Sequence, residues 1–236
     1  MPKYSKPKPK STAKSRSMTP WLIGAGVLFV LLIVFAVFMN SRSSAVNVAE
    51  RNVDAAWLQR TTLGNPDATV TVQAWEDFLC PACQQWTSTI EPRLEEEYVN
   101  TGLVKLEYHQ FPLNIHAPGA QMSAMAAECA ADQGAFWIYH DRLFQEAARS
   151  GQAGTTLDRL VSYADDLNLD VADFRSCMTT QKHRTTVDAS VNQAVALGLN
   201  STPSILINGK LMEEPFNYNA LSSEIDRLLE AAGVTP

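Results

Sequence analysis

Two cysteines, Cys80 and Cys83, stand where a strand pattern gives way to a helix pattern, and no other feature constrains the fold as much. Before them, residues 69–75 (TVTVQAW) alternate between apolar and polar side chains, as in a half-buried strand. After them a helical stretch is expected to run to about Asn100, and Pro81 suits its first position, where a missing N–H loses no bond. A spacing of three on a helix puts both sulfurs on one face, one turn apart. The sequence therefore predicts a strand–helix unit with a cysteine pair at its junction.

The helix start changes the chemistry of this pair. Free backbone N–H groups and the positive end of the helix dipole favour a thiolate at Cys80, so its pKa should lie well below the ordinary value of about 8.5. A stabilised thiolate is a good leaving group, which makes the disulfide oxidising. The alternatives are a structural bridge and a zinc half-site, but zinc would need Cys129 and Cys177 as partners, at a spacing unlike a zinc ribbon. Redox chemistry is the favoured interpretation, and no metal site is predicted.

Residues 21–39 form an apolar run of 19 residues without a charge. A helix of that length spans about 28 Å, close to the hydrocarbon core of a bilayer. All six cations of the first 39 residues precede the run, so the positive-inside rule predicts a cytoplasmic N-terminus and export of the rest. A cleaved signal peptide is the alternative, with residues 43–45 (SSA) as a passable cleavage site, although the run is longer than signal peptides usually carry. We predict an uncleaved membrane anchor.

The charges divide the chain into two parts. The whole chain has 19 Lys and Arg against 25 Asp and Glu, a net charge of −6. Residues 1–39 hold six of the cations and no acid, which leaves residues 40–236 with 13 cations against 25 acids, a net charge of −12. A domain this acidic argues against nucleic acid as a partner. Once exported, its cysteines would meet an oxidising compartment in which disulfides persist.

Turn and helix signals indicate one domain after a tail, an anchor and a linker. The expected boundaries are a cytoplasmic basic tail at 1–19, a transmembrane anchor at 20–39, a linker at 40–60 and a domain at 61–236. Within the domain we expect a second strand at 103–108, a block of four or five helices at about 114–199, a hairpin at 204–212 and a terminal helix at 219–232. Two strands joined through a helix should be parallel, so the sequence predicts an α/β fold.

Two motifs together carry a family resemblance. Residues 75–83 read WEDFLCPAC, and residues 201–209 read STPSILING, with Thr202 and Pro203 directly before an apolar strand. This pair of motifs resembles the DsbA-like thioredoxin family, and most of all its membrane-anchored, exported thiol oxidases. The resemblance covers about residues 63–233. It implies a thioredoxin fold with a helical insertion between the second strand and the strand that follows Pro203.

The resemblance also implies roles for the residues of both motifs. Cys80 would be the exposed nucleophile, the sulfur that a substrate thiolate attacks, and Cys83 the shielded partner that resolves the mixed disulfide. Pro203 would follow a cis peptide bond and pack against the disulfide. Thr202 would offer its backbone to an extended substrate, as an added strand. The cysteine pair carries the electrons itself, so no bound cofactor is implied.

Two positions depart from the family pattern. Ala82, which with Pro81 separates the two cysteines, stands where DsbA has a His that helps to stabilise the thiolate. Ala74 stands where many members carry an acid, six residues before the first cysteine. In the family, that acid relays protons to the cysteines. Glu76 and Asp77 lie closer to the cysteines here, and either would be a substitute for it. We expect instead that both are solvated acids.

Cys129 and Cys177 fall on predicted helices of the insertion. Free cysteines pack well in cores, which is one interpretation. In an oxidising compartment we predict a structural disulfide, as some members of the family carry, and closing a loop of about 48 residues would contribute roughly 4 kcal/mol in the chain-entropy model. The four histidines are scattered, with no two at positions i and i+4 of one helix, so each is expected at the surface or at a helix cap.

These observations predict a thiol–disulfide oxidoreductase. The expected reaction is an oxidation, in which the Cys80–Cys83 disulfide passes to exported proteins with cysteines as they fold, and a quinone-linked membrane partner of the DsbB type reoxidises the pair. A reductase or isomerase with the same site is one alternative, although no dimerisation segment of the kind an isomerase needs is apparent, so a monomer is expected. The other alternative is a non-enzymatic chaperone or binding module in which the thioredoxin fold only presents a groove.

Overall fold

The computed structural model describes residues 51, 53 and 55–234, which lie within a compact unit that runs from Asn47 to Pro236. The predicted tail and anchor, residues 1–39, and the linker up to residue 50 lie outside the described residues. In the part that is described, no helix has the length and apolar character needed to cross a bilayer. The transmembrane segment therefore stays a prediction from the sequence.

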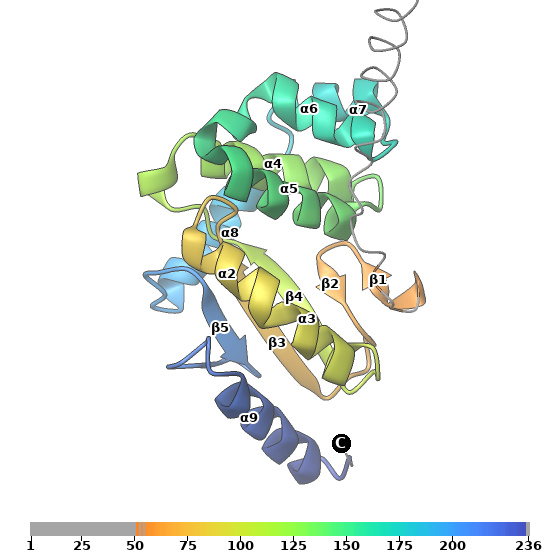
Figure 1. Ribbon diagram of the computed structural model, residues 1–236, viewed down its shortest axis with the longest axis vertical. Helices are drawn as coiled ribbons and strands as arrows, with labels where there is room; N and C mark the ends of the chain where they lie inside the picture. Colours follow the sequence, from red (N-terminus) through yellow and green to blue (C-terminus); the bar gives the residue numbers. More distant parts are fainter. Residues whose placement is uncertain (1–50, 52, 54, 235–236) are drawn as a thin grey trace, which may run out of the picture. The chain divides into compact units, whose positions relative to one another are not determined.

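Six strands form one mixed sheet in the domain (Figure 1). They are β1 (Leu58–Gln59), β2 (Thr62–Leu63), β3 (Val70–Glu76), β4 (Val104–Gln110), β5 (Ser204–Ile207) and β6 (Lys210–Leu211), in the spatial order β1-β2-β4-β3-β5-β6. β3 and β4 pair in parallel, as predicted, and β5 runs antiparallel to β3. Asn208 and Gly209, both with positive φ, form the turn between β5 and β6, so the predicted hairpin is confirmed.

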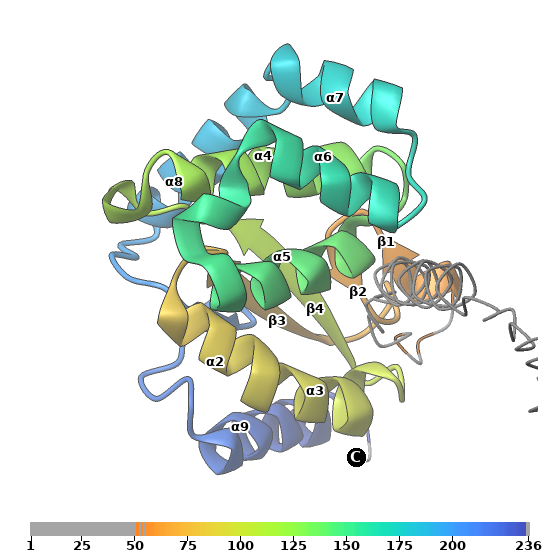
Figure 2. The same cartoon turned by 45° about the horizontal axis from the view of Figure 1, so that its top comes forward.

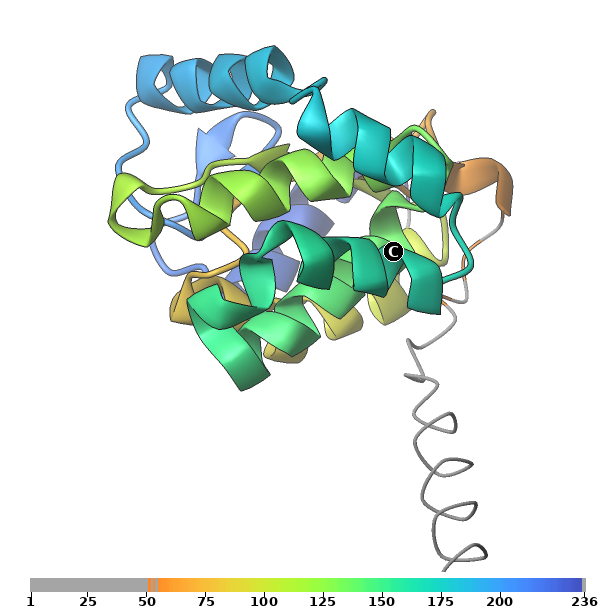
Figure 3. The same cartoon turned by 90° about the horizontal axis from the view of Figure 1, so that it is seen from above.

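Side chains of the central strands pack into two apolar layers. Val72 and Ala74 of β3 belong to the main core, while Trp75 packs with Ala194 and Leu206 in a second cluster. The first layer lies under α2 (Pro81–Thr89), α3 (Glu91–Leu94), the π-helical turn η2 (Glu95–Val99) and α9 (Tyr218–Ala231). The second layer lies under α8 (Arg184–Ala196), which Figure 3 shows on the side of the strands away from α2. Both sides of β3 are therefore covered at its C-terminal end, where Ala74, Trp75 and Glu76 are all buried.

The helical stretch predicted after the cysteine pair, in which Pro92 is expected to cause a kink, is divided into two helices at that point. α2 ends at Thr89 and α3 begins at Glu91, with Ile90 between them. Pro92 is the second residue of α3, and because it has no N–H to donate to the carbonyl of residue 88, the hydrogen-bond ladder is interrupted there. The break falls beside Glu91, whose side chain is buried.

A block of helices separates β4 from β5, as predicted for residues 114–199 (Figure 2). It contains the 3-10 turn η3 (Asn114–His116), α4 (Gly119–Ala131), α5 (Phe136–Ser150), the 3-10 turn η4 (Gly151–Thr155), α6 (Leu157–Asp166) and α7 (Val171–Thr179), and it ends with α8. α4 is buried along nearly all of its length, and its many alanines let the neighbouring helices approach it closely. These five α-helices agree with the four or five that the sequence predicts.

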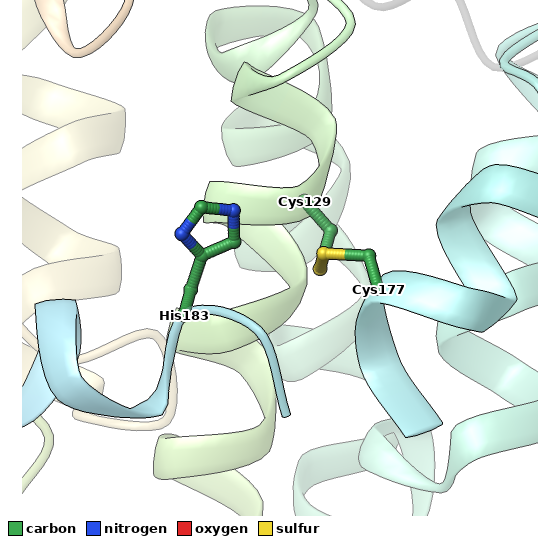
Figure 4. A group of neighbouring side chains, drawn as sticks. All are labelled: Cys129, Cys177 and His183. Carbon is green, nitrogen blue, oxygen red and sulfur yellow. A yellow bond between two sulfur atoms is a disulfide. The ribbon is translucent and has the colours of Figure 1, made fainter. Parts of the chain in front are cut away.

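A disulfide joins α4 to α7 inside this block (Figure 4). It links Cys129 to Cys177, the pair expected from the sequence, across a separation of 48 residues. His183, the N-cap residue of α8, lies beside the sulfurs and bonds through Nε2 to Asp132 at 2.7 Å. The disulfide therefore sits in a polar corner where three helices of the insertion meet.

The domain begins earlier in the chain than predicted. The 3-10 turn η1 (Ala55–Trp57) and the β1–β2 hairpin occupy residues 55–63, most of which the sequence assigns to the linker. β2 pairs with β4, and at Gly64 an added Cβ would lie 2.6 Å from the carbonyl oxygen of Val104. The φ of +109° at Gly64 also favours glycine. The end of the predicted linker therefore belongs to the sheet.

Candidate active site

The two cysteines predicted as a redox pair stand at the start of α2. Cys80 is its N-cap residue, with extended backbone, and Pro81 occupies the first helical position, as predicted. Both cysteines are thiols in this structure. Cys80 retains 7% of its accessible surface, whereas Cys83 retains none. A reactant that approaches from solvent therefore meets Cys80 and not Cys83.

The loop before β5 closes against the first cysteine. Cys80 Sγ lies 3.4 Å from the carbonyl oxygen of Thr202, which is also buried. The peptide bond between Thr202 and Pro203 is cis, as the resemblance implies. The fold thus brings together two motifs that lie about 120 residues apart in the chain, and it places a backbone carbonyl at the reactive sulfur.

The surroundings of Cys80 favour its charged form. A hydrogen bond from the Cys83 thiol has the largest effect in lowering the pKa of Cys80, to about 5, with burial acting against it. The backbone N–H groups of Cys83 and Ala82 add further hydrogen bonds to the thiolate. Ala82 therefore supports the site through its backbone at the helix start, although it lacks the histidine ring found in DsbA.

The surroundings of Cys83 favour its neutral thiol form. Burial raises the pKa of the Cys83 thiol far above its usual range, and the neighbouring Cys80 thiolate and Glu76 carboxyl raise it further. The backbone N–H of Asp77 points to Cys83 Sγ at 3.5 Å. The reduced site is therefore a thiolate beside a thiol, with the charge on the exposed sulfur.

Glu76, the last residue of β3, is fully buried, so the prediction of a solvated acid is wrong at this position. The reason is tertiary, because helices cover both faces of β3. Glu76 Oε2 accepts a hydrogen bond from the Thr87 hydroxyl at 3.3 Å. Burial, and then the negative charge of Glu91, raise the pKa of Glu76 well above its usual range. The buried site therefore favours the neutral carboxylic acid form of Glu76.

Asp77 is buried as well, so the same prediction is wrong there, but its carboxylate is fully bonded. Oδ1 accepts the backbone N–H of Leu79 at 2.8 Å, and Oδ2 accepts the N–H of Leu113 at 2.9 Å. Oδ2 also lies 2.7 Å from Nδ1 of His116. Asp77 therefore ties the active-site loop to the segment that leads to a second cis bond, between residues 117 and 118, which the sequence did not predict.

A second buried polar group lies behind the cysteines, and the sequence did not indicate it. Glu91 is 2% exposed and pairs with the guanidinium of Arg51 at 2.9 Å. His140 is fully buried, so its predicted surface position is wrong, and its ring packs edge-on against Tyr108 with centroids 5.0 Å apart. The only sequence signal for this group was Glu91 beside the helix-breaking Pro92, since Arg51 lies in the predicted linker.

Two clusters among the described residues have donor types that bind metals. In one, Cys129 and Cys177 are bonded to each other, so their sulfurs hold no free thiolate. In the other, formed by Glu91, His140 and Asp141, the Arg51 guanidinium bonds to both carboxylates. A cationic side chain thus already neutralises the second cluster.

Comparison with known proteins supports the same chemistry. A family model described as Thioredoxin matches residues 58–227. The probable disulfide bond formation protein D of Bacillus cereus is 28% identical over 214 residues, which cover 89% of this chain and 97% of that protein. Oxidised BdbD from Bacillus subtilis superposes with a TM-score of 0.66 at 23% identity, over 72% of this chain and 92% of that one. DsbA from Chlamydia trachomatis superposes with a TM-score of 0.65 at 18% identity, over 74% and 93%.

These similarities agree with the geometry of the site. The fold is a thioredoxin fold in which a helical insertion separates β4 from β5, as predicted. The cysteine pair at the helix start and the cis-proline loop lie together in that fold. The chain therefore belongs to the thioredoxin family and is a DsbA-like thiol–disulfide oxidoreductase.

Proposed function

We propose that the protein is an oxidase that donates its Cys80–Cys83 disulfide to exported proteins with cysteines as they fold. The observation that carries this proposal is the stabilised thiolate of Cys80, with a pKa of about 5 beside a buried Cys83 thiol. A thiolate stabilised in the reduced state favours reduction of the enzyme, and therefore oxidation of the substrate. The similarity to a disulfide bond formation protein supports the same direction.

The first step transfers the disulfide to the substrate. A substrate thiolate attacks Cys80 Sγ, the Cys80–Cys83 bond breaks, and its electron pair leaves on Cys83 Sγ. The neutral Glu76 carboxyl neighbours that sulfur and gives it the proton, so Cys83 becomes a thiol and Glu76 a carboxylate. This proton transfer avoids a buried thiolate, which the apolar surroundings of Cys83 disfavour.

The second step releases the product. A second thiolate of the substrate attacks the substrate sulfur of the mixed disulfide, and Cys80 leaves as its stabilised thiolate. The backbone of Thr202, beside Cys80 Sγ, would align an extended substrate segment. Ile115 is 83% exposed and lies in the segment that Asp77 ties to the active-site loop, so it offers an apolar contact for an unfolded substrate.

The proposed location rests on the sequence, and the proposed reoxidising partner rests on the family resemblance. We propose that residues 21–39 anchor the protein in the membrane with the basic tail in the cytoplasm, which puts the cysteines in an oxidising compartment. A quinone-linked membrane protein of the DsbB type would accept the two electrons, and the domain would act as a monomer. Sequencing the N-terminus of the purified membrane-bound protein tests the anchor, and a mature start near residue 46 would contradict it.

The test of the oxidase function uses a reduced, unfolded enzyme whose activity returns only when its disulfides form. The oxidised protein should restore that activity, while Cys80→Ser should restore none. Incubated with the disulfide-bonded form of the same enzyme, Cys83→Ser should accumulate a mixed disulfide, because its Cys80 thiolate attacks a substrate disulfide and no second cysteine releases it. A non-reducing gel detects this species. A wild-type protein that reduces disulfides of the folded substrate, and forms none, would instead be a reductase. Full folding activity in Cys80→Ser would indicate a chaperone.

A further inference from the structure

The carboxylic acid of Glu76 has a second carboxyl group behind it. Glu91 is 2% exposed and lies at the start of α3, two residues past the end of α2 and four past Thr87, whose hydroxyl bonds to Glu76 Oε2. Glu91 Oε1 accepts a hydrogen bond from Nη2 of Arg51 at 2.9 Å. Arg51 is itself largely buried and also pairs with Glu95 and Asp141. One buried cation therefore anchors Glu91, whereas among the residues that the structure describes no cation bonds to Glu76.

Several elements around these carboxyls contribute titratable groups. Glu76 faces Cys80 and Cys83 at the start of α2, Glu91 on α3 and Tyr108 on β4. Glu91 faces Arg51 from the segment before β1, Glu95 on η2, Tyr108 on β4, and His140 and Asp141 on α5. Glu76 thus interacts with the cysteines and with Glu91, and Glu91 in turn pairs with Arg51.

The two carboxyls are not equivalent. An ion pair with Arg51 favours the charged form of Glu91, whereas a buried Glu76 without a cation favours the neutral form. A negative charge on Glu91 then disfavours a second negative charge on Glu76, as in other buried carboxyl pairs. The geometry therefore places the charge on Glu91 and the proton on Glu76.

We propose that Glu91, anchored by Arg51, is a positioning residue for the thiol site, because its negative charge keeps the proton on Glu76 for transfer to Cys83. The proposal rests on the proposed oxidase function and on Glu76 as its acid. It is consistent with the pKa shifts of the two groups, since burial, opposed by Arg51, raises the pKa of Glu91 to about 7, and burial together with the charge of Glu91 raises that of Glu76 well above its usual range. Above pH 7 the charge on Glu91 would therefore help Glu76 to remain an acid.

The test measures how fast dithiothreitol reduces the oxidised full-length protein between pH 5 and pH 10, with each rate corrected for the thiolate fraction of the reductant. In the wild type, loss of the Glu76 proton should appear as a fall in rate at the alkaline end. In Glu91→Gln we expect this fall to move to lower pH by at least one unit. At a pH above both transitions, the variant should then react at least tenfold more slowly than the wild type.

Two variants separate charge from structure. Glu95→Gln removes a neighbouring carboxylate that also pairs with Arg51 but is not among the groups that act on Glu76, so its profile should match the wild type. Glu91→Asp keeps the charge and should restore the wild-type profile. A Glu91→Gln profile that coincides with the wild type would overturn the proposal, and so would an equal shift in Glu95→Gln.

A measurement on the wild type covers the case in which Glu91→Gln does not fold. In protein with 13C-labelled glutamate carboxyls, NMR should show the Glu76 carboxyl still protonated at pH 8, and an ionised Glu76 at pH 7 would overturn the proposal. The oxidase function and the role of Glu91 can be refuted by different results. A wild type that cannot oxidise dithiols refutes the oxidase function, whereas normal turnover with coincident profiles refutes only the role of Glu91.

Discussion

At the scale of single residues, the site depends on a contrast between two neighbouring sulfurs. Cys80 sits at the helix start, where backbone N–H groups and the Cys83 thiol stabilise its charge. Cys83 sits one turn inside the helix, where burial disfavours any charge. The same spacing of three residues therefore produces a good leaving group and a protected thiol.

A thiolate titration tests this contrast directly. In the reduced protein, the thiolate absorbance in the ultraviolet should rise with a midpoint near pH 5, because hydrogen bonds from Cys83 and the helix start lower the pKa of Cys80. Cys83→Ser serves as the control for assignment, since the signal should remain and come from Cys80 alone. A midpoint above pH 8 would show that the helix start does not stabilise the thiolate.

The same shift predicts how stability depends on pH. The pKa of Cys80 is lower in the folded, reduced protein than in the unfolded chain, so between about pH 5 and pH 8.5 the unfolded state binds one more proton. The stability of the reduced form relative to the oxidised form should therefore rise with pH in this window. The slope is at most about 1.4 kcal/mol per pH unit, which is reached only where the two states differ by a full proton. Urea unfolding of both forms measures it, and a difference that falls with pH would contradict the account.

At the scale of elements, Asp77 holds the loop before α2 to the segment after β4. It accepts the N–H groups of Leu79 and Leu113 and contacts His116. Hydrogen bonds to a charged group contribute about 1.5–3 kcal/mol each, so Asp77→Ala should lower the free energy of unfolding by roughly 3–5 kcal/mol. The exposed Asp67→Ala is the matched control, with an expected change within about 0.5 kcal/mol. If Asp77→Ala lowered the free energy of unfolding by less than about 1 kcal/mol, Asp77 would not hold the two segments together.

The disulfide between α4 and α7 is expected to stabilise the fold without affecting the active site. Replacing both Cys129 and Cys177 by Ala should lower the free energy of unfolding by about 4 kcal/mol, because a loop of 48 residues is no longer closed in the unfolded chain. The groups that act on Cys80 all lie in α2 and at Thr202, so its thiolate midpoint should stay within about half a pH unit. A large shift of that midpoint would show that the bridge also tunes the active site.

At the scale of the whole molecule, the sequence predicted the features that depend on local spacing. The parallel pair of β3 and β4, the helical insertion and the cysteine pair at the helix start all follow from periodicity and motif distance. The burial of Glu76, Asp77 and His140 does not, because α5 and α8 are far away in the chain from β3 and pack on it only in the folded domain. The ion pair of Arg51 with Glu91 joins residues 40 positions apart, and no local pattern indicates such a contact.

The folded domain is proposed to make the Cys80–Cys83 disulfide an oxidant. The reduction potential of this pair, measured against glutathione, tests that proposal most directly. DsbA combines a thiolate pKa of about 3.5 with a potential of about −120 mV, and thioredoxin combines about 7 with about −270 mV. With a thiolate pKa of about 5, the pair should lie between them, at about −180 mV. A potential at or below about −250 mV would place the protein with the reductases and contradict the proposed oxidase function.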